Sequence, residues 1–518
     1  MSTEDATLAT GSTPADVVHE AVVVGTGFGG LAAAIELRRT GVQDVVLLEK
    51  ADDLGGVWRD NRYPGCACDV RSHLYSFSFA PSSQWSRTFA RQPEIWEYLR
   101  TVAADFGVAE RIRYGEELVD ARYVNGTWQL TTARGTSLRT RSLVLATGAL
   151  HEPSLPSIEG LDSFGGTIFH TANWPDDDTA AIDGRRVAVL GTGASAVQAV
   201  PQLAPRAAHL TVLQRTPPWI LPKADRPVSE REQRWLEKVP GLNWLVRSGI
   251  YWRNESQVIA FTSKPGVMKV MEKLSRRTLS KAVTDPVVRE KLTPQYRMGC
   301  KRILLSNDYL PTYNRPDVTL ETAAIARIEP DAVVTVEGVR HEVDTLVLST
   351  GFAVTEPFQH LTVTGPGGRT LREAWAEGMQ AHLGVTVAGF PNLFFVVGPN
   401  SGLGHNSMIF MIETQTRYLA QCISLRDKAG ARSIGVPQQV QDEFNAELTK
   451  RSKHTVWASG CHSWYIDRFG NNRVLWPAST VNFWRRTRRV DPRHVVLDPE
   501  LGRAAASPAA SPTEGVSA

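Results

Sequence analysis

The amino-acid sequence predicts an α/β protein with two Rossmann-like dinucleotide-binding domains and a helical insertion in the second of them. Two glycine-rich stretches, GTGFGG at 25–30 and GTGASA at 191–196, each follow a short apolar run and precede a helical pattern. Between residues 217 and 297, tryptophan, lysine and arginine recur at helical spacing, which predicts helices. The stretch 164–175, FGGTIFHTANWP, lies between the two units and organises our interpretation of the chain.

The composition is that of a globular enzyme. The 518 residues are 42% hydrophobic and 21% charged, and the net charge of +3 favours neither a nucleic-acid partner nor an acidic substrate. The chain has no signal-peptide pattern and no run of about 18 apolar residues, so we expect no membrane partner and a cytoplasmic location. We expect the Ala/Ser/Pro/Thr-rich ends, 1–18 and 503–518, to be disordered tails.

The five cysteines are scattered along the chain at Cys66, Cys68, Cys300, Cys422 and Cys461. An odd number without framework spacing argues against a disulfide scaffold and for a reducing compartment. The CxC spacing of the first two is neither a CxxC redox motif nor a zinc motif. We therefore expect buried or incidental thiols and no metal site.

The first nucleotide unit runs from the apolar residues at 20–24 to the strand pattern DVVLLEK. Its glycines Gly25, Gly27 and Gly30 let the backbone approach a pyrophosphate at the N-terminus of the following helix. Glu49 follows about 20 residues later, where an acid hydrogen-bonds ribose hydroxyls. This order of strand, turn, helix, strand and acid predicts an FAD site.

The second unit repeats this order but has no acid at its end. Gly191 and Gly193 follow the strand pattern RRVAVL, and the second strand ends in Gln214 and Arg215, where Glu49 stands in the first unit. An acid there would repel a 2′-phosphate, whereas an arginine pairs with one, which favours NADPH over NADH. A solvated surface arginine is the alternative interpretation of Arg215.

Further patterns complete the predicted domain order. A helix is predicted over 92–106, and strands over 117–146 with a hairpin turn at Asn125–Gly126. Strand patterns also precede Gly148 and Gly351, as in chains that pass between two dinucleotide sites. The predicted order is a tail (1–18), the FAD-binding domain (19–150), the NADP-binding domain (151–216), the helical insertion (217–297), the rest of the NADP-binding domain (298–350), the rest of the FAD-binding domain (351–502) and a second tail (503–518).

Two longer motifs resemble the signatures of the Baeyer–Villiger monooxygenases. The joining stretch matches F-x-G-x-x-x-H-x-x-x-W-P through Phe164, Gly166, His170, Trp174 and Pro175. The glycine- and proline-rich loop after the first unit matches G-G-x-W-x-x-x-x-Y-P-G-x-x-x-D through Gly55, Gly56, Trp58, Tyr63, Pro64, Gly65 and Asp69. The resemblance covers the chain from about residue 20 to about residue 490. It implies an enzyme that uses FAD and NADPH to insert one oxygen atom next to a ketone carbonyl.

The resemblance also implies a mechanism and a set of site residues. In that family NADPH reduces FAD, and reduced flavin with O2 forms a C4a-peroxyflavin whose anion attacks the ketone to give an ester or lactone. Arg302 matches the active-site arginine, and Asp69 matches the aspartate that orients it. We expect His170 and Trp174 to hold the linker rather than to transfer protons. The implied cofactor-binding residues are Gly25, Gly27, Phe28, Gly30, Glu49, Lys50, Gly56, Val57, Trp58, Asp69, Tyr75, Thr192, Gly193, Ala194, Ser195, Gln198, Arg215, Thr216, Lys301 and Arg302.

Other functions on the same scaffold remain open from the sequence. The nearest alternative is a flavin-dependent oxygenase of sulfur or nitrogen atoms, but Arg302 with Asp69 favours a ketone, since a carbonyl adduct needs oxyanion support. A disulfide reductase would need a CxxC motif, and a silent flavoprotein would not need this pair. The expected partners are a ketone and O2, and the expected state is a monomer or homodimer. The ketone itself depends on the insertion and on the loop at 403–408.

Overall fold

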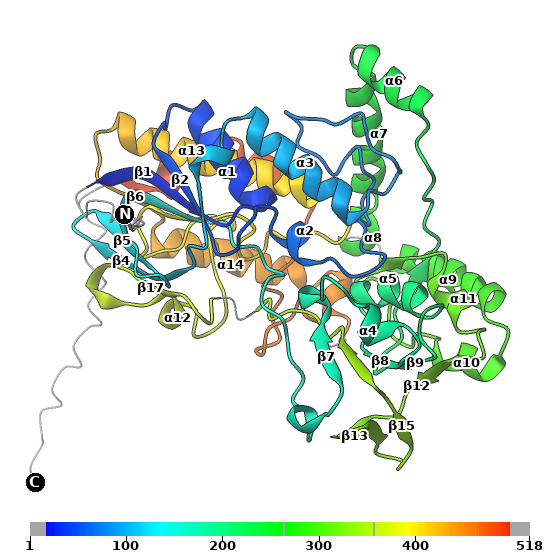
Figure 1. Ribbon diagram of the computed structural model, residues 1–518. Helices are drawn as coiled ribbons and strands as arrows, with labels where there is room; N and C mark the ends of the chain where they lie inside the picture. The colour runs from blue at the N-terminus through cyan, green and yellow to red at the C-terminus, as the bar shows by residue number, and fades with distance from the viewer. Residues whose placement is uncertain (1–16, 263–264, 356–357, 461–462, 498–518) are drawn as a thin grey trace, which may run out of the picture.

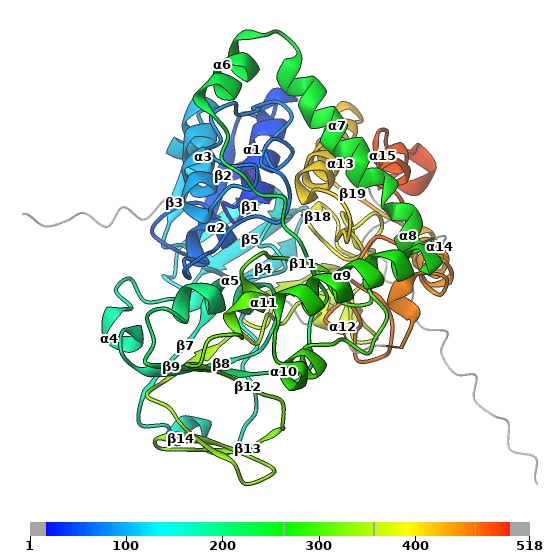
Figure 2. The same cartoon turned by 90° about the vertical axis from the view of Figure 1, so that its right-hand side faces the viewer.

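The computed structural model describes residues 17–262, 265–355, 358–460 and 463–497. The beginning and the end of the chain together build one body, and the middle of the chain builds a second body below and beside it (Figures 1 and 2). Of the expected tails, residues 1–16 and 503–518 lie outside the described residues, while Val18 already belongs to the first strand.

The first body is organised around an eight-stranded sheet whose path runs β17-β4-β5-β6-β1-β2-β3, with β18 paired to β6. The glycine-loop strand β1 is central and pairs in parallel with β2 and β6, so its carboxyl end meets theirs. The hairpin predicted at Asn125–Gly126 is confirmed, because both residues adopt positive φ between β4 and β5. The strands are β1 (Val18–Val24), β2 (Val45–Glu49), β3 (Ile112–Tyr114), β4 (Leu118–Val124), β5 (Thr127–Thr132), β6 (Ser137–Leu145), β17 (Thr362–Thr364) and β18 (Leu393–Phe395).

Helices from both ends of the chain cover this sheet. Helix α1 (Phe28–Arg39) is buried on nearly all sides, and its small alanine residues let the long helix α13 (Met408–Lys428) pack closely beside it (Figure 1). Helix α3 (Gln92–Asp105) confirms the helix predicted over 92–106. The remaining helices of this body are α2 (Val57–Asp60), α12 (Leu371–Ala374), α14 (Gln438–Ser452) and α15 (Thr480–Thr487), and a short pair, β19 (Ile434–Gly435) with β20 (Val496–Leu497), lies near its edge.

The second body is organised around a parallel five-stranded sheet in the order β12-β9-β8-β16-β7. The middle residues of its strands β8 and β9 are buried on both faces, as expected when helices cover a parallel sheet. Part of the joining stretch 164–175 belongs to this sheet. Its residues Thr167–His170 form the edge strand β7, which pairs with β16. The elements are β7 (Thr167–His170), β8 (Arg186–Leu190), β9 (His209–Leu213), β12 (Val318–Glu321), β16 (Thr345–Leu348), α4 (Thr179–Ile182), α5 (Ala194–Leu203) and α11 (Tyr309–Thr312).

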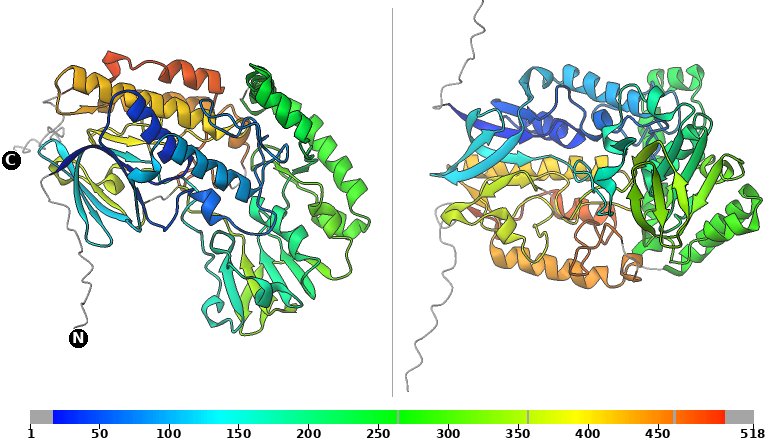
Figure 3. Two further views of the ribbon diagram at one scale, coloured as in Figure 1. Left: turned by 45° about the horizontal axis from the view of Figure 1, so that its top comes forward. Right: turned by 60° about the horizontal axis from the view of Figure 1, so that its bottom comes forward.

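The helices predicted between 217 and 297 are present and run along one side of the molecule (Figure 2). The chain leaves the second body after β10 (Ile220–Leu221), and these helices pass over the first body. The chain then returns at β11 (Leu304–Leu305), which pairs in parallel with β10. In Figure 3 (left) they form a continuous strip at one edge. The helices are α6 (Glu230–Lys238), α7 (Leu242–Ser256), α8 (Val258–Thr262), α9 (Met268–Ala282) and α10 (Pro286–Lys291).

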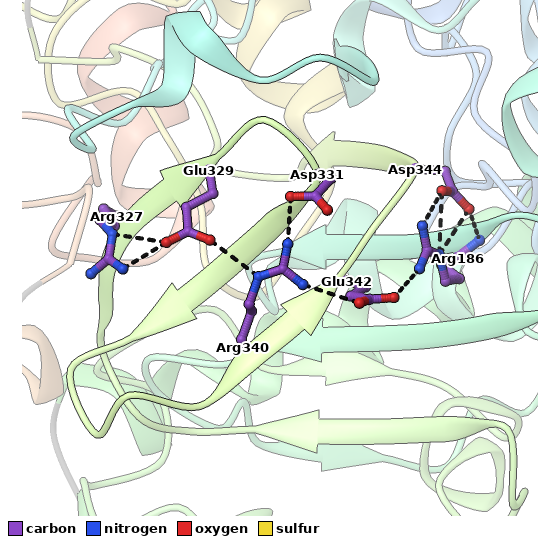
Figure 4. Close-up of polar contacts among 7 residues, drawn as sticks. All are labelled: Arg186, Arg327, Glu329, Asp331, Arg340, Glu342 and Asp344. Atoms are coloured by element: carbon purple, nitrogen blue, oxygen red, sulfur yellow. Dashed lines mark hydrogen bonds and ion pairs between the residues drawn. The ribbon is translucent and has the colours of Figure 1, made fainter.

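A small antiparallel sheet, which the sequence analysis did not predict, extends from the second body. It is held by an exposed chain of ion pairs in which Arg340 contacts Glu329, Asp331 and Glu342, and Arg186 of β8 contacts Glu342 and Asp344 (Figure 4). Each exposed pair contributes little alone, but the chain ties the small sheet to the main one. Its strands are β13 (Ile325–Glu329), β14 (Ala332–Thr335) and β15 (Arg340–Glu342).

Single turns of 3-10 helix fill several connections, at η1 (Ala109–Arg111), η2 (Leu161–Ser163), η3 (Thr171–Asn173), η4 (Pro265–Val267), η5 (Pro366–Gly368), η6 (Val456–Ala458) and η7 (Pro492–His494). Within the described ranges, each helix is too short or too polar to cross a bilayer. Nor do the described side chains include a group of three or more His, Cys, Asp or Glu that could hold a metal ion.

The expectation of buried thiols that form no disulfide is confirmed for Cys66, Cys68 and Cys422, which are free and buried. Cys300 departs from it, because Cys300 is disulfide-bonded. A pairing made by the fold leaves no mark in local cysteine spacing, which is why the sequence pattern did not predict it. The fifth cysteine, Cys461, lies outside the described residues.

Candidate active site

The first glycine loop joins β1 to α1 and requires glycine at two of its positions. Gly25 has φ of +99°, and a Cβ there would lie 2.6 Å from the carbonyl oxygen of Ala146. A Cβ on Gly30 would lie 1.8 Å from the carbonyl oxygen of Gly25. No side chain caps α1 at Gly27, so the first N–H groups of this helix face the position that a pyrophosphate takes in such loops.

The loop at 55–69 packs directly on the first glycine loop. A Cβ on Gly56, whose φ is +53°, would lie 3.2 Å from the Cα of Gly27, so the two loops meet backbone to backbone. Beside them, the Trp58 indole N–H donates to the Tyr75 hydroxyl at 3.0 Å, and Tyr75 packs on Phe28 with ring centroids 5.2 Å apart. The structure therefore brings Phe28, Trp58 and Tyr75 together with both loops, as an FAD site requires.

Glu49 ends β2 as a buried carboxylate that holds the glycine loop. Its Oε2 accepts from the backbone N–H of Thr26 at 3.2 Å and from the Thr26 hydroxyl at 2.5 Å. Its Oε1 lies 2.9 Å from Arg59 Nη1. Oε1 also accepts from the backbone N–H of Ala51 at 3.1 Å, so these four contacts use the roughly four acceptor positions of a carboxylate, and Glu49 serves the site by fixing the loop. The adjacent Lys50 is exposed.

The second glycine loop joins β8 to α5 with the same geometry. Gly191 has φ of +113°, and a Cβ there would lie 2.3 Å from the carbonyl oxygen of Ser349. Helix α5 starts at Ala194, and no side chain caps it at Gly193. The Thr192 hydroxyl donates to the carbonyl oxygen of Thr216 at 2.8 Å and so joins the loop to the segment that follows β9.

Two cations lie beyond the second loop. Arg215 is exposed immediately after β9, and Lys301 comes from the segment before β11, where its Nζ lies 5.1 Å from the Tyr296 ring centroid. Burial lowers the pKa of Lys301, and the positive charge of Arg215 lowers it further. Two like charges held together by separate segments form an attractive position for a dianion such as a 2′-phosphate.

Gln198 of α5 connects the two nucleotide units. Its amide oxygen accepts from the Tyr63 hydroxyl at 3.0 Å and from the backbone N–H of Ala67 at 3.3 Å, and its amide nitrogen donates to the carbonyl oxygen of Ala67 at 2.9 Å. Gly65 lies against the same turn, since a Cβ there would lie 2.5 Å from the Gln198 carbonyl oxygen. Gln198, predicted as a cofactor-binding residue, thus uses its amide to hold the 55–69 loop against α5.

The structure pairs Arg302 with Asp69 at the junction of the two bodies. Arg302 Nε donates to Asp69 Oδ2 at 3.0 Å, and Nη2 contacts the same oxygen. The Asp69 carboxylate raises the pKa of Arg302. Burial alone would raise the pKa of Asp69, but the charge of Arg302 outweighs it and lowers that pKa. Both groups are therefore charged at neutral pH, and 39% of the Arg302 side chain stays exposed for other contacts.

Tyr465 and Lys223 interact electrostatically with the Arg302–Asp69 pair, and the sequence analysis predicted neither of them. Tyr465 is 2% exposed, and burial raises its pKa to about 12, with Arg302 and Asp69 as the charges that act on it. Lys223 lies with its Nζ 5.1 Å from the Phe89 ring centroid, and burial lowers its pKa, against the attraction of carboxylates that include Asp69. In the sequence, Tyr465 belongs to an aromatic-rich stretch at 456–479, a composition that does not by itself indicate a site residue.

The loop at 403–408 is fixed by a buried carboxylate of the insertion. Glu255 of α7 accepts from the Asn406 amide at 2.9 Å and from the Thr480 hydroxyl at 2.6 Å, and its Oε2 lies 3.3 Å from His405 Nε2. Burial alone would raise the pKa of Glu255, but these hydrogen bonds outweigh it and lower the pKa to about 2. The loop before α13 is therefore tied to both α7 and α15.

His170 and Trp174 are both buried in the joining stretch. His170 Nδ1 accepts from the backbone N–H of Ala172 at 3.1 Å, and burial lowers the pKa of the ring, which keeps it neutral. The Trp174 indole N–H donates to Asp178 at 3.0 Å, and its ring packs edge-on against Phe169 at 4.8 Å. These contacts match packing and turn-forming roles rather than proton transfer.

The two loops define a class of protein. Each offers a cradle that a Cβ would fill and a helix N-terminus without a side-chain cap, so the residues present fit two dinucleotides. An acid ends the second strand of the first unit, and two cations lie beyond the second unit, which fits FAD in the former and NADPH in the latter. The fold and site are those of a two-dinucleotide flavoprotein oxidoreductase.

Comparison with known proteins narrows the class. A family model described as pyridine nucleotide-disulphide oxidoreductase matches residues 22–278. A Baeyer-Villiger monooxygenase of Streptomyces coelicolor is 44% identical over 504 residues, covering 96% of each chain. A second Baeyer-Villiger monooxygenase, from Pseudomonas aeruginosa, is 42% identical over 489 residues, covering 93% of this chain and 92% of its own.

Solved structures agree with these relatives. OTEMO in complex with FAD and NADP superposes with a TM-score of 0.83 at 28% identity, covering 93% of this chain and 99% of its own. Cyclohexanone monooxygenase from Rhodococcus sp. Phi1 bound to NADP+ superposes with a TM-score of 0.84 at 29% identity, with the same coverage. The chain belongs to the Baeyer–Villiger monooxygenases, the flavin- and NADPH-dependent enzymes that insert one oxygen atom next to a ketone carbonyl. The predicted fold class and family are thereby confirmed.

Proposed function

We propose that this enzyme converts a ketone to an ester or lactone with Arg302 and Asp69 as its catalytic pair. The observation that carries the proposal is the charged contact between them, made by two segments far apart in the chain at the junction of the two bodies. A carbonyl that is attacked by an oxygen nucleophile develops negative charge on its oxygen. A fixed multi-donor guanidinium stabilises that charge without first having to reorganise.

The cofactors, when bound, supply the reducing equivalents and the activated oxygen. The protein supplies their positions and the charge around them. The glycine loops bind the pyrophosphates through backbone N–H groups, and Glu49 keeps the first loop in place through its two hydrogen bonds from Thr26. Arg215 and Lys301 pair with the 2′-phosphate and make the enzyme prefer NADPH to NADH.

Asp69 acts in this proposal through Arg302. Its carboxylate holds Nε and Nη2 on one side of the guanidinium, which leaves the other N–H groups to face substrate. Because the pKa of Asp69 is lowered and that of Arg302 is raised, both members of the pair are charged at neutral pH. Neither group donates a proton in the reaction; the pair supplies fixed charge and orientation.

The test is a product assay on the purified, FAD-loaded enzyme. A panel of linear, cyclic, aryl and steroid ketones is screened for NADPH oxidation, and the products are identified by mass spectrometry, with one thioether as comparison. We expect at least one ketone to yield an ester or lactone in proportion to NADPH consumed. Sulfoxide formation with no ester from any ketone would favour heteroatom oxygenation instead. The cytoplasmic location and the monomeric or homodimeric state remain predictions.

A further inference from the structure

Helix α7 of the insertion is joined to the rest of the protein through polar contacts. Asn243, Arg247, Tyr251 and Glu255 follow one another at four-residue spacing, which places them on one face of the helix. All four contact the first body, and Arg247 donates to the carbonyl oxygens of His73 and Leu74 at 3.1 and 3.3 Å. A surface helix of a globular protein ordinarily turns its apolar face inward, whereas α7 makes these contacts through polar groups and leaves several large apolar side chains exposed.

Helix α7 also exposes three large apolar side chains. Trp244 is 70% exposed, Leu245 61% and Trp252 61%; helical spacing places Leu245 and Trp252 opposite the four contact residues, and Trp244 at the border of the contact face near the start of the helix. The strip continues beyond α7, where Val270 of α9 is 69% exposed and Leu274 is 44% exposed. Figure 2 shows α7, α8 and α9 following one another across the side that faces the viewer. An exposed apolar surface of this extent marks an interaction site.

The charges along this strip have one sign. Lys269, Lys273, Arg277 and Lys281 of α9 are exposed, as is Arg253 of α7. Each of the two helices contains one acid, and both acids point inward: Glu255 to the loop at 403–408, and Glu272 to the backbone N–H of Met298 at 3.0 Å. Exposed tryptophan and aliphatic side chains interleaved with lysine and arginine are the composition of helices that lie on anionic bilayers.

We propose that this insertion face, formed by Trp244, Leu245 and Trp252 of α7 with Val270, Leu274 and the exposed cations of α9, binds the surface of an anionic lipid bilayer. The apolar side chains enter the headgroup boundary, and the cations contact lipid phosphates. A second copy of the chain is the less favoured occupant, because a two-fold contact of this face with itself brings cations together. The sequence-based expectation of no membrane partner rested on the lack of a spanning segment, and peripheral binding does not need one.

The experiment is co-sedimentation of the FAD-loaded enzyme with vesicles of phosphatidylcholine alone or mixed with phosphatidylglycerol. We expect sedimentation with the mixed vesicles only, weakened by salt. The double variant Trp244→Ser/Trp252→Ser should lower the partition coefficient about tenfold or more, and Lys273→Glu/Arg277→Glu should lower it by a similar factor. Trp484→Ser is the matched control, because Trp484 is 39% exposed on α15, outside this face.

Every variant is first checked for its flavin spectrum, melting temperature and ketone oxidation without vesicles, all of which should equal those of the parent enzyme. The proposal is overturned if neither vesicle sediments the enzyme, or if the Trp244→Ser/Trp252→Ser variant binds as well as the parent. It is also overturned, in favour of self-association, if light scattering shows a dimer that this variant converts to a monomer.

Discussion

Replacing Glu255 by glutamine should weaken the hydrogen bonds that connect the helical insertion to the loop at 403–408. The substitution keeps the shape of the side chain and therefore leaves no cavity. It removes the negative charge and replaces one acceptor oxygen by an NH2 donor. In the parent protein the carboxylate accepts from Asn406 and Thr480, contacts His405, and also accepts from the backbone N–H of Val481 at 3.3 Å.

The magnitude follows from the pKa of this carboxyl. A pKa lowered from its ordinary 4.5 to about 2 corresponds to about 3 kcal/mol in favour of the ionised form in the folded protein. Charge-assisted hydrogen bonds of ~1.5–3 kcal/mol each are consistent with that figure. If the 518-residue chain unfolds cooperatively, its entropy of unfolding is about 1 kcal/mol per degree, so Glu255→Gln should lower Tm by about 3 °C.

The pH dependence has a definite sign. Because the folded-state pKa of Glu255 lies below its ordinary value, the stabilisation is complete above pH 4.5 and is lost as the pH falls toward 2. The assay is thermal unfolding of parent and variant from pH 7 downward, with the exposed Glu290→Gln as control. The Tm deficit should be constant near neutral pH and shrink below pH 4.5. A variant as stable as the parent at pH 7, or a deficit that grows on acidification, would refute the reasoning.

Three other predictions concern the cofactor and catalytic residues. Arg215→Ala should raise the KM for NADPH far more than that for NADH in steady-state assays, and an equal change would mean that Arg215 does not contact the 2′-phosphate. Gly30→Ala should abolish FAD retention, read from the flavin absorbance of the purified protein, because its Cβ would lie 1.8 Å from a carbonyl oxygen, while Gly249→Ala, with open space around its Cβ, should retain FAD. Asp69→Asn should lower ester formation at least about tenfold while NADPH binding persists, and unchanged ester formation would remove Asp69 from the site.

The sequence predicted the parts of this fold that depend on local backbone geometry. Gly25 and Gly191 need positive φ and the absence of a Cβ, requirements that a chain can meet only with glycine, so the two loops were visible in the residue pattern. The helices at 92–106 and within 217–297 follow from apolar and polar periodicity. The pairing of Arg302 with Asp69 came from motif resemblance alone, since nothing local relates the two positions.

The remaining features depend on contacts between distant segments. Tyr465 and Glu255 reach the site and the 403–408 loop through tertiary packing, and neither belongs to a motif. The four residues Thr167–His170 form β7 only because β16 offers an edge to pair with. The polar contacts of α7 were hidden for a related reason: periodicity shows that a helix is amphipathic but not which of its residues point inward.

The most direct test of the central claim is Arg302→Ala, measured for two steps in the same preparation. The account predicts that the anaerobic reduction of bound FAD by NADPH, followed by stopped-flow absorbance, stays within about threefold of the parent rate, while ester formation falls on the order of 100-fold or more. Exposed Arg122→Ala on β4 should change neither step. Ester formed by the Arg302→Ala enzyme at the parental rate and yield would contradict the account.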